Sequence, residues 1–513
     1  MPPDTPLPGR LGPPLRPDTL RPPPAPRRPG RDGLAGAILG FGLAAAAAAQ
    51  GLPAEVDAAL QRARMPASAL AVTVQEVGRT APRLDWQAER PMKPASLLKL
   101  VTTTAALDLL GPAWSWSTPV WLQGPVRDGV LEGDLVIKGS GDPKLVMERT
   151  WLLLRRVRQL GVREIGGDLV LDRSAFAAPR QDPADFDGEA SRPYNVQPDA
   201  LMINFKSVVY TFTPDPARGL AVVSADPPLA GVRMPANVPL AAGPCGDWRG
   251  ALEAVLGDPT LVRFQGTYAG ACGERQWPVA YADPASYNGR ALAGLWEEMG
   301  GRLRGHVRDG GSPSTPPTFE VRSPGLAEVV RDINKFSNNM MAEQLYLTLG
   351  LTQRGSGTPE AAREAVRLWL EERHGGAAAG TVIDNGSGLS RDSRTTARLL
   401  AQLLQSTWSG PVMSELMSSL PASGLDGTLK RAGGAPAGRA HLKTGSLRDV
   451  AGIAGYVLAN SGRRYVVVAI VNHANAPAAR PVLDAIAQWA VADVPRPLPT
   501  MPPQASATSP LQR

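Results

Sequence analysis

The residues best suited to chemistry in this chain are a serine and a lysine three positions apart, Ser96 and Lys99. Residues 94–110 carry apolar and small side chains at helical spacing, which predicts a helix that ends at Gly111. Side chains three apart share a helix face, so the Ser96 hydroxyl can meet the Lys99 amine. A lysine whose pKa is lowered by burial can take the serine proton and create a nucleophile. Alone, the pair fits equally well an ordinary helix start with a solvated lysine.

A second string, Lys443-Thr444-Gly445-Ser446, lies on an expected strand at residues 440–446. Its glycine lets a substrate backbone approach the strand edge, and its lysine and hydroxyl groups can bind a carboxylate. An ordinary edge strand could carry the same string.

A third string, Ser337-Asn338-Asn339, precedes an expected helix that begins at Met340. Serine and asparagine are also preferred helix N-caps, so a purely structural role is the alternative. A rival Ser-x-Asn stands at residues 286–288, and the surroundings of Ser337 favour the later string.

The elements around these strings change type along the chain. β-Branched residues predict strands, and apolar side chains at helical spacing predict helices. The expected strands cover residues 68–77, 83–87, 131–139, 168–172, 208–213, 440–446, 450–458 and 464–471, and the expected helices cover residues 94–110, 147–160, 289–299, 326–333, 339–349, 359–374 and 478–490.

Composition narrows the class of protein. The formal net charge is +7, and residues 1–50, with six arginines against three aspartates, supply +3 of it. The remaining +4 is spread over more than 450 residues without clustered basic and aromatic side chains, which argues against nucleic-acid binding. Cys245 and Cys272 are the only cysteines. In an exported chain a disulfide between them is favoured over a metal pair or two free thiols.

The two ends of the chain differ from its middle. Residues 1–50 combine a Pro/Arg-rich extension with an uncharged run from Gly33 to Ala49, the order typical of a secretory signal. We expect cleavage near Ala49 or Gln50, rather than a retained anchor, and a periplasmic mature protein. Residues 492–513 form a Pro-rich tail without periodicity, which predicts disorder.

Together, the three strings resemble the active-site signature of penicillin-recognising serine enzymes, in the order Ser-x-x-Lys, Ser-x-Asn, Lys-Thr-Gly. The 237 residues between Lys99 and Ser337 are unlike a compact β-lactamase. They resemble the D-alanyl-D-alanine carboxypeptidase/endopeptidase family, the class C low-molecular-mass penicillin-binding proteins. Asn385 departs from the family pattern, which has a continuous Asp-Gly-Ser-Gly-Leu-Ser. Further strings similar to the family lie at residues 139–143, 245–249, 335–343, 384–391 and 420–429.

The resemblance implies an α/β (α+β) fold, in which a five-stranded antiparallel sheet lies between helical layers. The peptidase domain would comprise residues 51–114 and 284–491, with a β-rich insertion of two nested modules at 115–283. The implied catalytic residues are Ser96, Lys99 and Ser337, the implied substrate-binding residues are Asn339, Lys443, Thr444, Gly445 and Ser446, and the implied disulfide joins Cys245 and Cys272.

The implied activity is that of a serine-type D-Ala-D-Ala carboxypeptidase and D,D-endopeptidase. It would act on peptidoglycan stem peptides and cross-links, and β-lactam antibiotics would acylate its serine. No metal or organic cofactor is implied, and peripheral association with the membrane or cell wall is compatible with this reading. The alternatives are a β-lactamase or esterase on the same fold, and a non-enzymatic peptidoglycan-binding scaffold.

Overall fold

The computed structural model describes residues 51–177, 182–431 and 437–494. The expected signal segment, with its cleavage site, and residues 495–513 of the expected tail lie outside these ranges. Within the described ranges, no helix has both the length and the apolar character needed to cross a bilayer.

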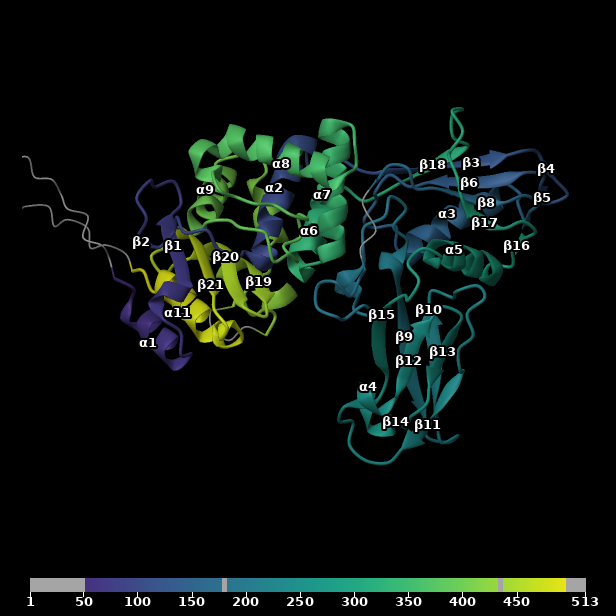
Figure 1. Ribbon diagram of the computed structural model, residues 1–513, viewed down its shortest axis with the longest axis horizontal. Helices are drawn as coiled ribbons and strands as arrows, with labels where there is room; N and C mark the ends of the chain where they lie inside the picture. The colour runs from purple at the N-terminus through teal and green to yellow at the C-terminus, as the bar shows by residue number, and fades with distance from the viewer. Residues whose placement is uncertain (1–50, 178–181, 432–436, 495–513) are drawn as a thin grey trace, which may run out of the picture. The chain divides into compact units, whose positions relative to one another are not determined.

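The central sheet is assembled from both ends of the chain. Its five strands run in the order β19-β20-β21-β1-β2, and every neighbouring pair is antiparallel. Figure 1 shows the purple β1 beside the yellow-green β21. The expected five-stranded sheet is confirmed. Its strands are β1 (Leu70–Glu76), β2 (Leu84–Trp86), β19 (Ala440–Leu447), β20 (Val450–Leu458) and β21 (Arg464–Asn472).

Helices cover both faces of this sheet because its inner strands are apolar on both sides. Along β21, Val466, Val468 and Ile470 belong to one core, while Val467 and Val471 belong to another. The second core lies under α1 (Ala54–Arg62) and α11 (Arg480–Val491). The first core lies under α2 (Lys99–Leu110), α6 (Leu326–Phe336), α7 (Asn339–Arg354), α8 (Pro359–His374), α9 (Ala397–Trp408) and α10 (Met413–Ser419).

A first β-rich module follows α2. Its strands form one five-stranded sheet, β17-β8-β6-β3-β18, and one four-stranded sheet, β16-β7-β5-β4. Strands β16, β17 and β18 come after residue 283, the expected end of the insertion. Because they pair with strands of this module, the module includes residues up to 322. The elements are β3 (Ser117–Gln123), β4 (Val126–Arg127), β5 (Val130–Leu131), β6 (Asp134–Lys138), α3 (Met147–Gln159), β7 (Glu164–Ile165), β8 (Leu169–Asp172), α5 (Tyr287–Glu298), β16 (Arg302–Leu303), β17 (Val307–Asp309) and β18 (Phe319–Arg322).

A second module is nested inside the first. Its main sheet has the order β14-β11-β10-β9-β15, and β12 pairs with β13 beside it. The elements are β9 (Ser207–Asp215), β10 (Leu220–Asp226), β11 (Asn237–Ala241), α4 (Trp248–Ala251), β12 (Ala254–Asp258), β13 (Leu261–Phe264), β14 (Tyr268–Ala269) and β15 (Arg275–Ala280).

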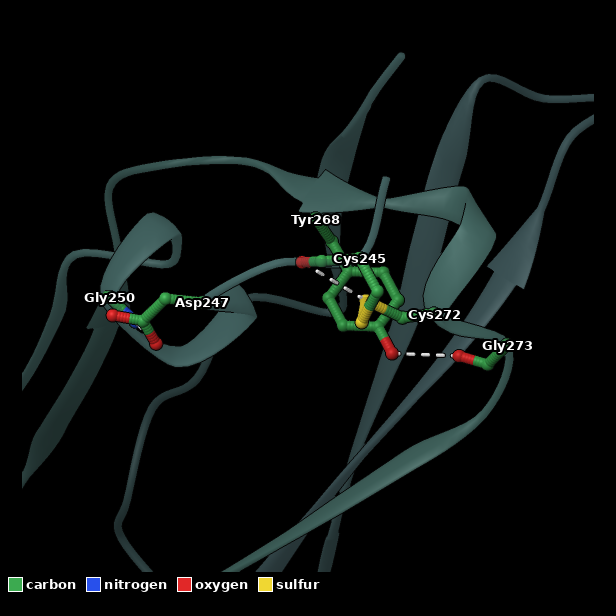
Figure 2. Close-up of a disulfide and its surroundings, with 6 residues drawn as sticks. All are labelled: Cys245, Asp247, Gly250, Tyr268, Cys272 and Gly273. Carbon is green, nitrogen blue, oxygen red and sulfur yellow. Dashed lines mark hydrogen bonds between the residues drawn. A yellow bond between two sulfur atoms is a disulfide. The ribbon is translucent and has the colours of Figure 1, made fainter. Parts of the chain in front are cut away.

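A disulfide joins Cys245 to Cys272 in this second module, as expected. Figure 2 shows the ring of Tyr268 beside it, with the Tyr268 hydroxyl donating to the Gly273 carbonyl at 2.7 Å. Tyr268 also stacks on Phe212 in the module core. The disulfide therefore links the segments that follow β11 and β14, beside the aromatic side chains of the module core.

Removing this disulfide is expected to loosen the second module alone. The two cysteines have a sequence separation of 27. Closing a loop of this size lowers the entropy of the unfolded chain, which stabilises the folded state by about 3 to 4 kcal/mol. In the double variant Cys245→Ser/Cys272→Ser, amide hydrogen exchange should rise over residues 207–280 and stay unchanged in the central sheet. Reductant should change the wild-type protein in the same way and leave the double variant as it is. Unchanged exchange over residues 207–280 would contradict the prediction.

Candidate active site

Ser96 lies in a short 3₁₀ turn, Ala95–Leu98, directly before α2. The single helix expected over residues 94–110 is therefore divided, with α2 beginning at Lys99. Ala95 has a φ of 47°, a left-handed conformation that costs a non-glycine residue energy. Because side chains at i and i+3 eclipse in a 3₁₀ turn, the Lys99 Nζ comes to 3.0 Å from the Ser96 Oγ.

The Lys99 amine is fully buried, with 0% of the residue exposed. It donates to the Asn339 Oδ1 at 2.7 Å and to the backbone carbonyl of Ser387 at 2.6 Å. A neutral amine has two hydrogens to donate and one lone pair. The two fixed acceptors use both hydrogens, which leaves the lone pair directed at the Ser96 hydroxyl.

Burial lowers the pKa of Lys99 to about 7, because water no longer solvates the ammonium, while the Glu343 carboxylate nearby opposes this change. A substantial fraction of the amine is therefore neutral near pH 7. Lys99 thus meets the electrostatic requirement for a base as well as the geometric one.

A second buried lysine completes the polar cluster. Lys443 Nζ donates to the Ser337 Oγ at 2.8 Å and to the carbonyl of Thr444 at 2.8 Å. Burial, and then the positive charge of Lys99, lower the pKa of Lys443. Ser337 ends α6 in a left-handed conformation, with a φ of 57°. That conformation turns the chain sharply between α6 and α7 and sets the serine in the cluster.

In the Ser-Asn-Asn string, one residue caps a helix and the other two contact the buried lysines. Asn338 is the N-cap of α7 and accepts from the backbone N–H of Met341 at 3.0 Å. Ser337 and Asn339, on either side of it, are left to contact Lys443 and Lys99. The rival Ser286 precedes α5 in the first module, where Asn288 donates to the buried carbonyl of Leu201. Only the later string joins the lysine cluster.

Strand β19 forms one wall of the site and is the edge strand of its sheet. A Cβ on Gly445 would lie 2.9 Å from the carbonyl oxygen of Pro94, so only glycine fits against the turn that carries Ser96. The hydroxyls of Thr444 and Thr428 are 2.8 Å apart. Ser446 is exposed on the same strand. Sequence patterns assigned no role to Thr428, although this residue lies in a string similar to the family.

The loop at residues 384–391 forms the opposite wall. Asn385, the departure from the family pattern, accepts from the backbone N–H groups of Ser387 and Gly388 and donates to the Leu389 carbonyl at 2.8 Å. The Thr102 hydroxyl of α2 donates to the Gly386 carbonyl at 2.7 Å. These bonds place the Ser387 carbonyl on Lys99. A carbonyl contact is a backbone property, so sequence patterns give no direct signal for it.

A cavity of about 440 Å³ opens beside the cluster. Its lining includes Glu343 of α7, Asp384 and Arg391 of the loop, and Tyr194 of the first module. The Tyr194 carbonyl accepts from the Asn339 Nδ2 at 3.4 Å. The sequence did not anticipate this contribution from the insertion. Among the residues that the structure describes, no group of three or more His, Cys, Asp or Glu side chains is arranged to hold a metal ion.

Comparison with known proteins agrees with this fold. Residues 52–493 match the model of the D-Ala-D-Ala carboxypeptidase 3 (S13) family. The chain is 31% identical over 459 residues to a D-alanyl-D-alanine carboxypeptidase of Actinomadura sp. (strain R39), which covers 84% of this chain and 83% of that protein. It is 23% identical to D-alanyl-D-alanine carboxypeptidase DacB of Haemophilus influenzae, which covers 76% and 82%. The crystal structure of penicillin binding protein 4 (dacB) from Haemophilus influenzae has the same fold, with a TM-score of 0.68, 21% identity, and coverage of 85% and 98%.

The family match places this protein among the peptidases. More narrowly, the chain belongs to the D-Ala-D-Ala carboxypeptidase (S13) family, and it is a hydrolase with carboxypeptidase activity.

Gly388→Ala is expected to lower this activity. A Cβ at this position would stand 1.9 Å from the Ala95 carbonyl oxygen, and Gly388 has a φ of 79°. The loop must then move away from the Ser96 turn, taking the Ser387 carbonyl with it. We expect kcat/KM for a D-Ala-D-Ala peptide to fall at least about tenfold, or about 1.4 kcal/mol of transition-state stabilisation.

The matched control for this prediction is Gly376→Ala, because a Cβ there would meet nothing within 4 Å. It should retain full activity. Equal kcat/KM values for the two variants would show that the approach of Gly388 to Ala95 is unimportant.

Proposed function

We propose that the chain is a serine-type D-Ala-D-Ala carboxypeptidase and D,D-endopeptidase that cleaves peptidoglycan stem peptides and cross-links through an acyl-enzyme on Ser96. The observation that carries this proposal is the Lys99 amine, held 3.0 Å from the Ser96 hydroxyl by acceptors from Asn339 and Ser387.

Acylation begins when the neutral Lys99 amine takes the proton of the Ser96 hydroxyl. The Ser96 oxygen attacks the carbonyl carbon of the penultimate D-Ala, and the carbonyl electron pair moves to its oxygen. The backbone N–H groups of Ser96 and Ser446 are the proposed oxyanion donors. In other acyl-transfer enzymes such a donor is worth about 3 to 4 kcal/mol.

Collapse of this intermediate breaks the C–N bond, and the leaving amine must receive a proton. Ser337 and Lys443 form the proposed relay, since the lysine donates to the serine hydroxyl at 2.8 Å. Because the pKa of Lys443 is lowered, its ammonium form is a stronger acid than that of an exposed lysine and gives up a proton more readily. Lys443 regains its proton from the Lys99 ammonium, which makes Lys99 neutral again. Lys99 then acts as the base when water hydrolyses the ester on Ser96, and the proton taken from water passes to the Ser96 oxygen as the ester bond breaks.

The edge of β19 is the proposed platform for the substrate. An extended peptide can pair with a free strand edge through main-chain hydrogen bonds. Thr444 and Ser446 would bind the terminal carboxylate. Gly445 between them has a different role from the expected one, because its missing side chain makes room for the turn that carries Ser96 rather than for the substrate. Asn339 has its amide oxygen committed to Lys99, but its amide nitrogen meets the Tyr194 carbonyl only at 3.4 Å. That nitrogen is available to orient the substrate amide.

The proposed location follows from the substrate. Cross-linked peptidoglycan lies outside the cytoplasmic membrane, so we propose an exported, periplasmic protein with peripheral contact to the cell wall or membrane. The disulfide at Cys245–Cys272 supports this, because such bonds persist in oxidising compartments.

Incubation with penicillin is expected to acylate Ser96. The β-lactam carbonyl would be attacked in the same way, and its amine stays tethered, so the ester should persist. Intact-mass and peptide-mapping measurements should find one adduct, located on Ser96, in the wild-type protein. Ser96→Ala should show none, while Ser286→Ala, which alters the rival string outside the site, should react as the wild type does. An adduct that survives Ser96→Ala would refute the proposed nucleophile.

Slow turnover of penicillin should exclude the second candidate, a β-lactamase. We expect about one equivalent of penicillin to be consumed per protein in the first minutes with almost no release of penicillinoate, because the tethered amine stays in the site and the ester on Ser96 persists. Continuous release over many turnovers would favour the β-lactamase.

Activity on purified cross-linked and uncross-linked stem peptides, measured side by side, gives the balance between endopeptidase and carboxypeptidase action. A Ser96→Ala variant that keeps every cellular role of the wild-type protein would favour a non-enzymatic scaffold.

A further inference from the structure

Glu343 lies one helical turn after Asn339 on α7, so the two side chains share a face of that helix. Asn339 reaches Lys99 directly. The Glu343 Oε1 instead accepts from the Ser387 hydroxyl at 2.8 Å. One face of α7 therefore contacts the base once directly and once through the loop.

Ser387 is the link between the carboxylate and the lysine. Its backbone carbonyl accepts from the Lys99 amine at 2.6 Å, while its hydroxyl donates to Glu343. The same hydroxyl accepts from the backbone N–H of Leu389 at 3.1 Å. The chain of contacts runs from Ser96 to Lys99, then to Ser387 and Glu343, and ends at the cavity that Glu343 lines.

The charges around this chain of contacts couple the lysine to the carboxylate. Burial raises the pKa of Glu343 to about 7, the hydrogen bond from Ser387 and the charge of Lys99 oppose this, and the Asp384 carboxylate adds to it. Lys443 is a second buried amine close enough to Lys99 for the two charges to repel. When Lys99 takes the Ser96 proton, the new ammonium has Glu343 as its compensating negative charge.

We propose that Glu343 is a positioning residue for the reaction, which holds the Ser387 carbonyl against Lys99 and stabilises the ammonium that forms when Lys99 takes the proton of Ser96. This inference rests on the proposed function, since it assumes that Ser96 and Lys99 perform the acylation. It assigns to a carboxylate outside the three motifs a role comparable to that of the aspartate in a Ser-His-Asp triad.

The test is the pH dependence of the rate at which penicillin acylates Ser96. Glu343→Gln keeps an acceptor for the Ser387 hydroxyl and removes only the charge. Without that charge the pKa of Lys99 falls, so its amine stays neutral to lower pH, but the ammonium formed during acylation is less stable. In Glu343→Gln, we expect the pH at which the acylation rate reaches half of its plateau to fall by about one unit. The wild-type protein should be acylated about tenfold faster than this variant at pH 8, but only about twofold faster at pH 6.

Two further variants separate charge from placement. Ser387→Ala keeps the carboxylate and removes the hydroxyl link, so the plateau rate should fall while the midpoint shifts little; this also tests the link if Glu343→Gln is unstable. Glu364→Gln removes a carboxylate that pairs with Arg367 at the surface of α8 and should leave the whole profile unchanged.

Three outcomes would overturn the inference. The first is an equal loss at every pH in Glu343→Gln, which would indicate a purely structural residue. The second is a wild-type rate in both Glu343→Gln and Ser387→Ala. The third is the absence of a Ser96 adduct in the wild-type protein, which would refute the proposed function and remove the basis of this inference with it.

Discussion

The burial of the Lys99 amine is the constraint on which the rest of the site depends. An amine removed from water must either lose its proton or find compensating partners, because an unpaired buried charge is very costly. Lys99 has both options within reach, with two acceptors for its hydrogens and Glu343 for its charge. Each acceptor comes from a different part of the fold, α7 or the loop at residues 384–391. The fold therefore has to bring α2, α7 and this loop together before the Lys99 amine can be held beside Ser96.

The sheet determines the position of Ser96. Leu97, the residue after Ser96, is seated on two glycines of neighbouring strands. A Cβ on Gly445 would lie 3.1 Å from the Leu97 Cγ, and a Cβ on Gly452 would lie 2.8 Å from the Leu97 Cδ1. The register pairs Gly445 with Gly452, so the two gaps lie side by side. The 3₁₀ turn packs closely onto the sheet at these gaps, which sets Ser96 beside the edge strand β19.

Sequence patterns predicted the three strings whose side chains the structure brings together, and most of the elements that carry them. The elements were predictable because α2 is a long apolar segment, and because strands β20 and β21 are buried on both faces. They missed the division of the helix at Lys99, since the left-handed conformation of Ala95 is imposed by packing. They also missed the carbonyl contacts of Ser387 and Tyr194, because any residue type supplies a carbonyl and only the tertiary path of the chain directs it.

The insertion, too, acts on the site through α7. Gln344, the residue after Glu343, accepts from the backbone N–H of Asp199 at 2.9 Å and donates to the Asp199 carbonyl at 2.8 Å. It is fully buried, so these bonds to the first module are costly to break. One helix thus has Asn339 on Lys99, Glu343 on the loop and Gln344 on the insertion. The position of α7 against Lys99 is therefore tied to the insertion by the two hydrogen bonds between Gln344 and Asp199.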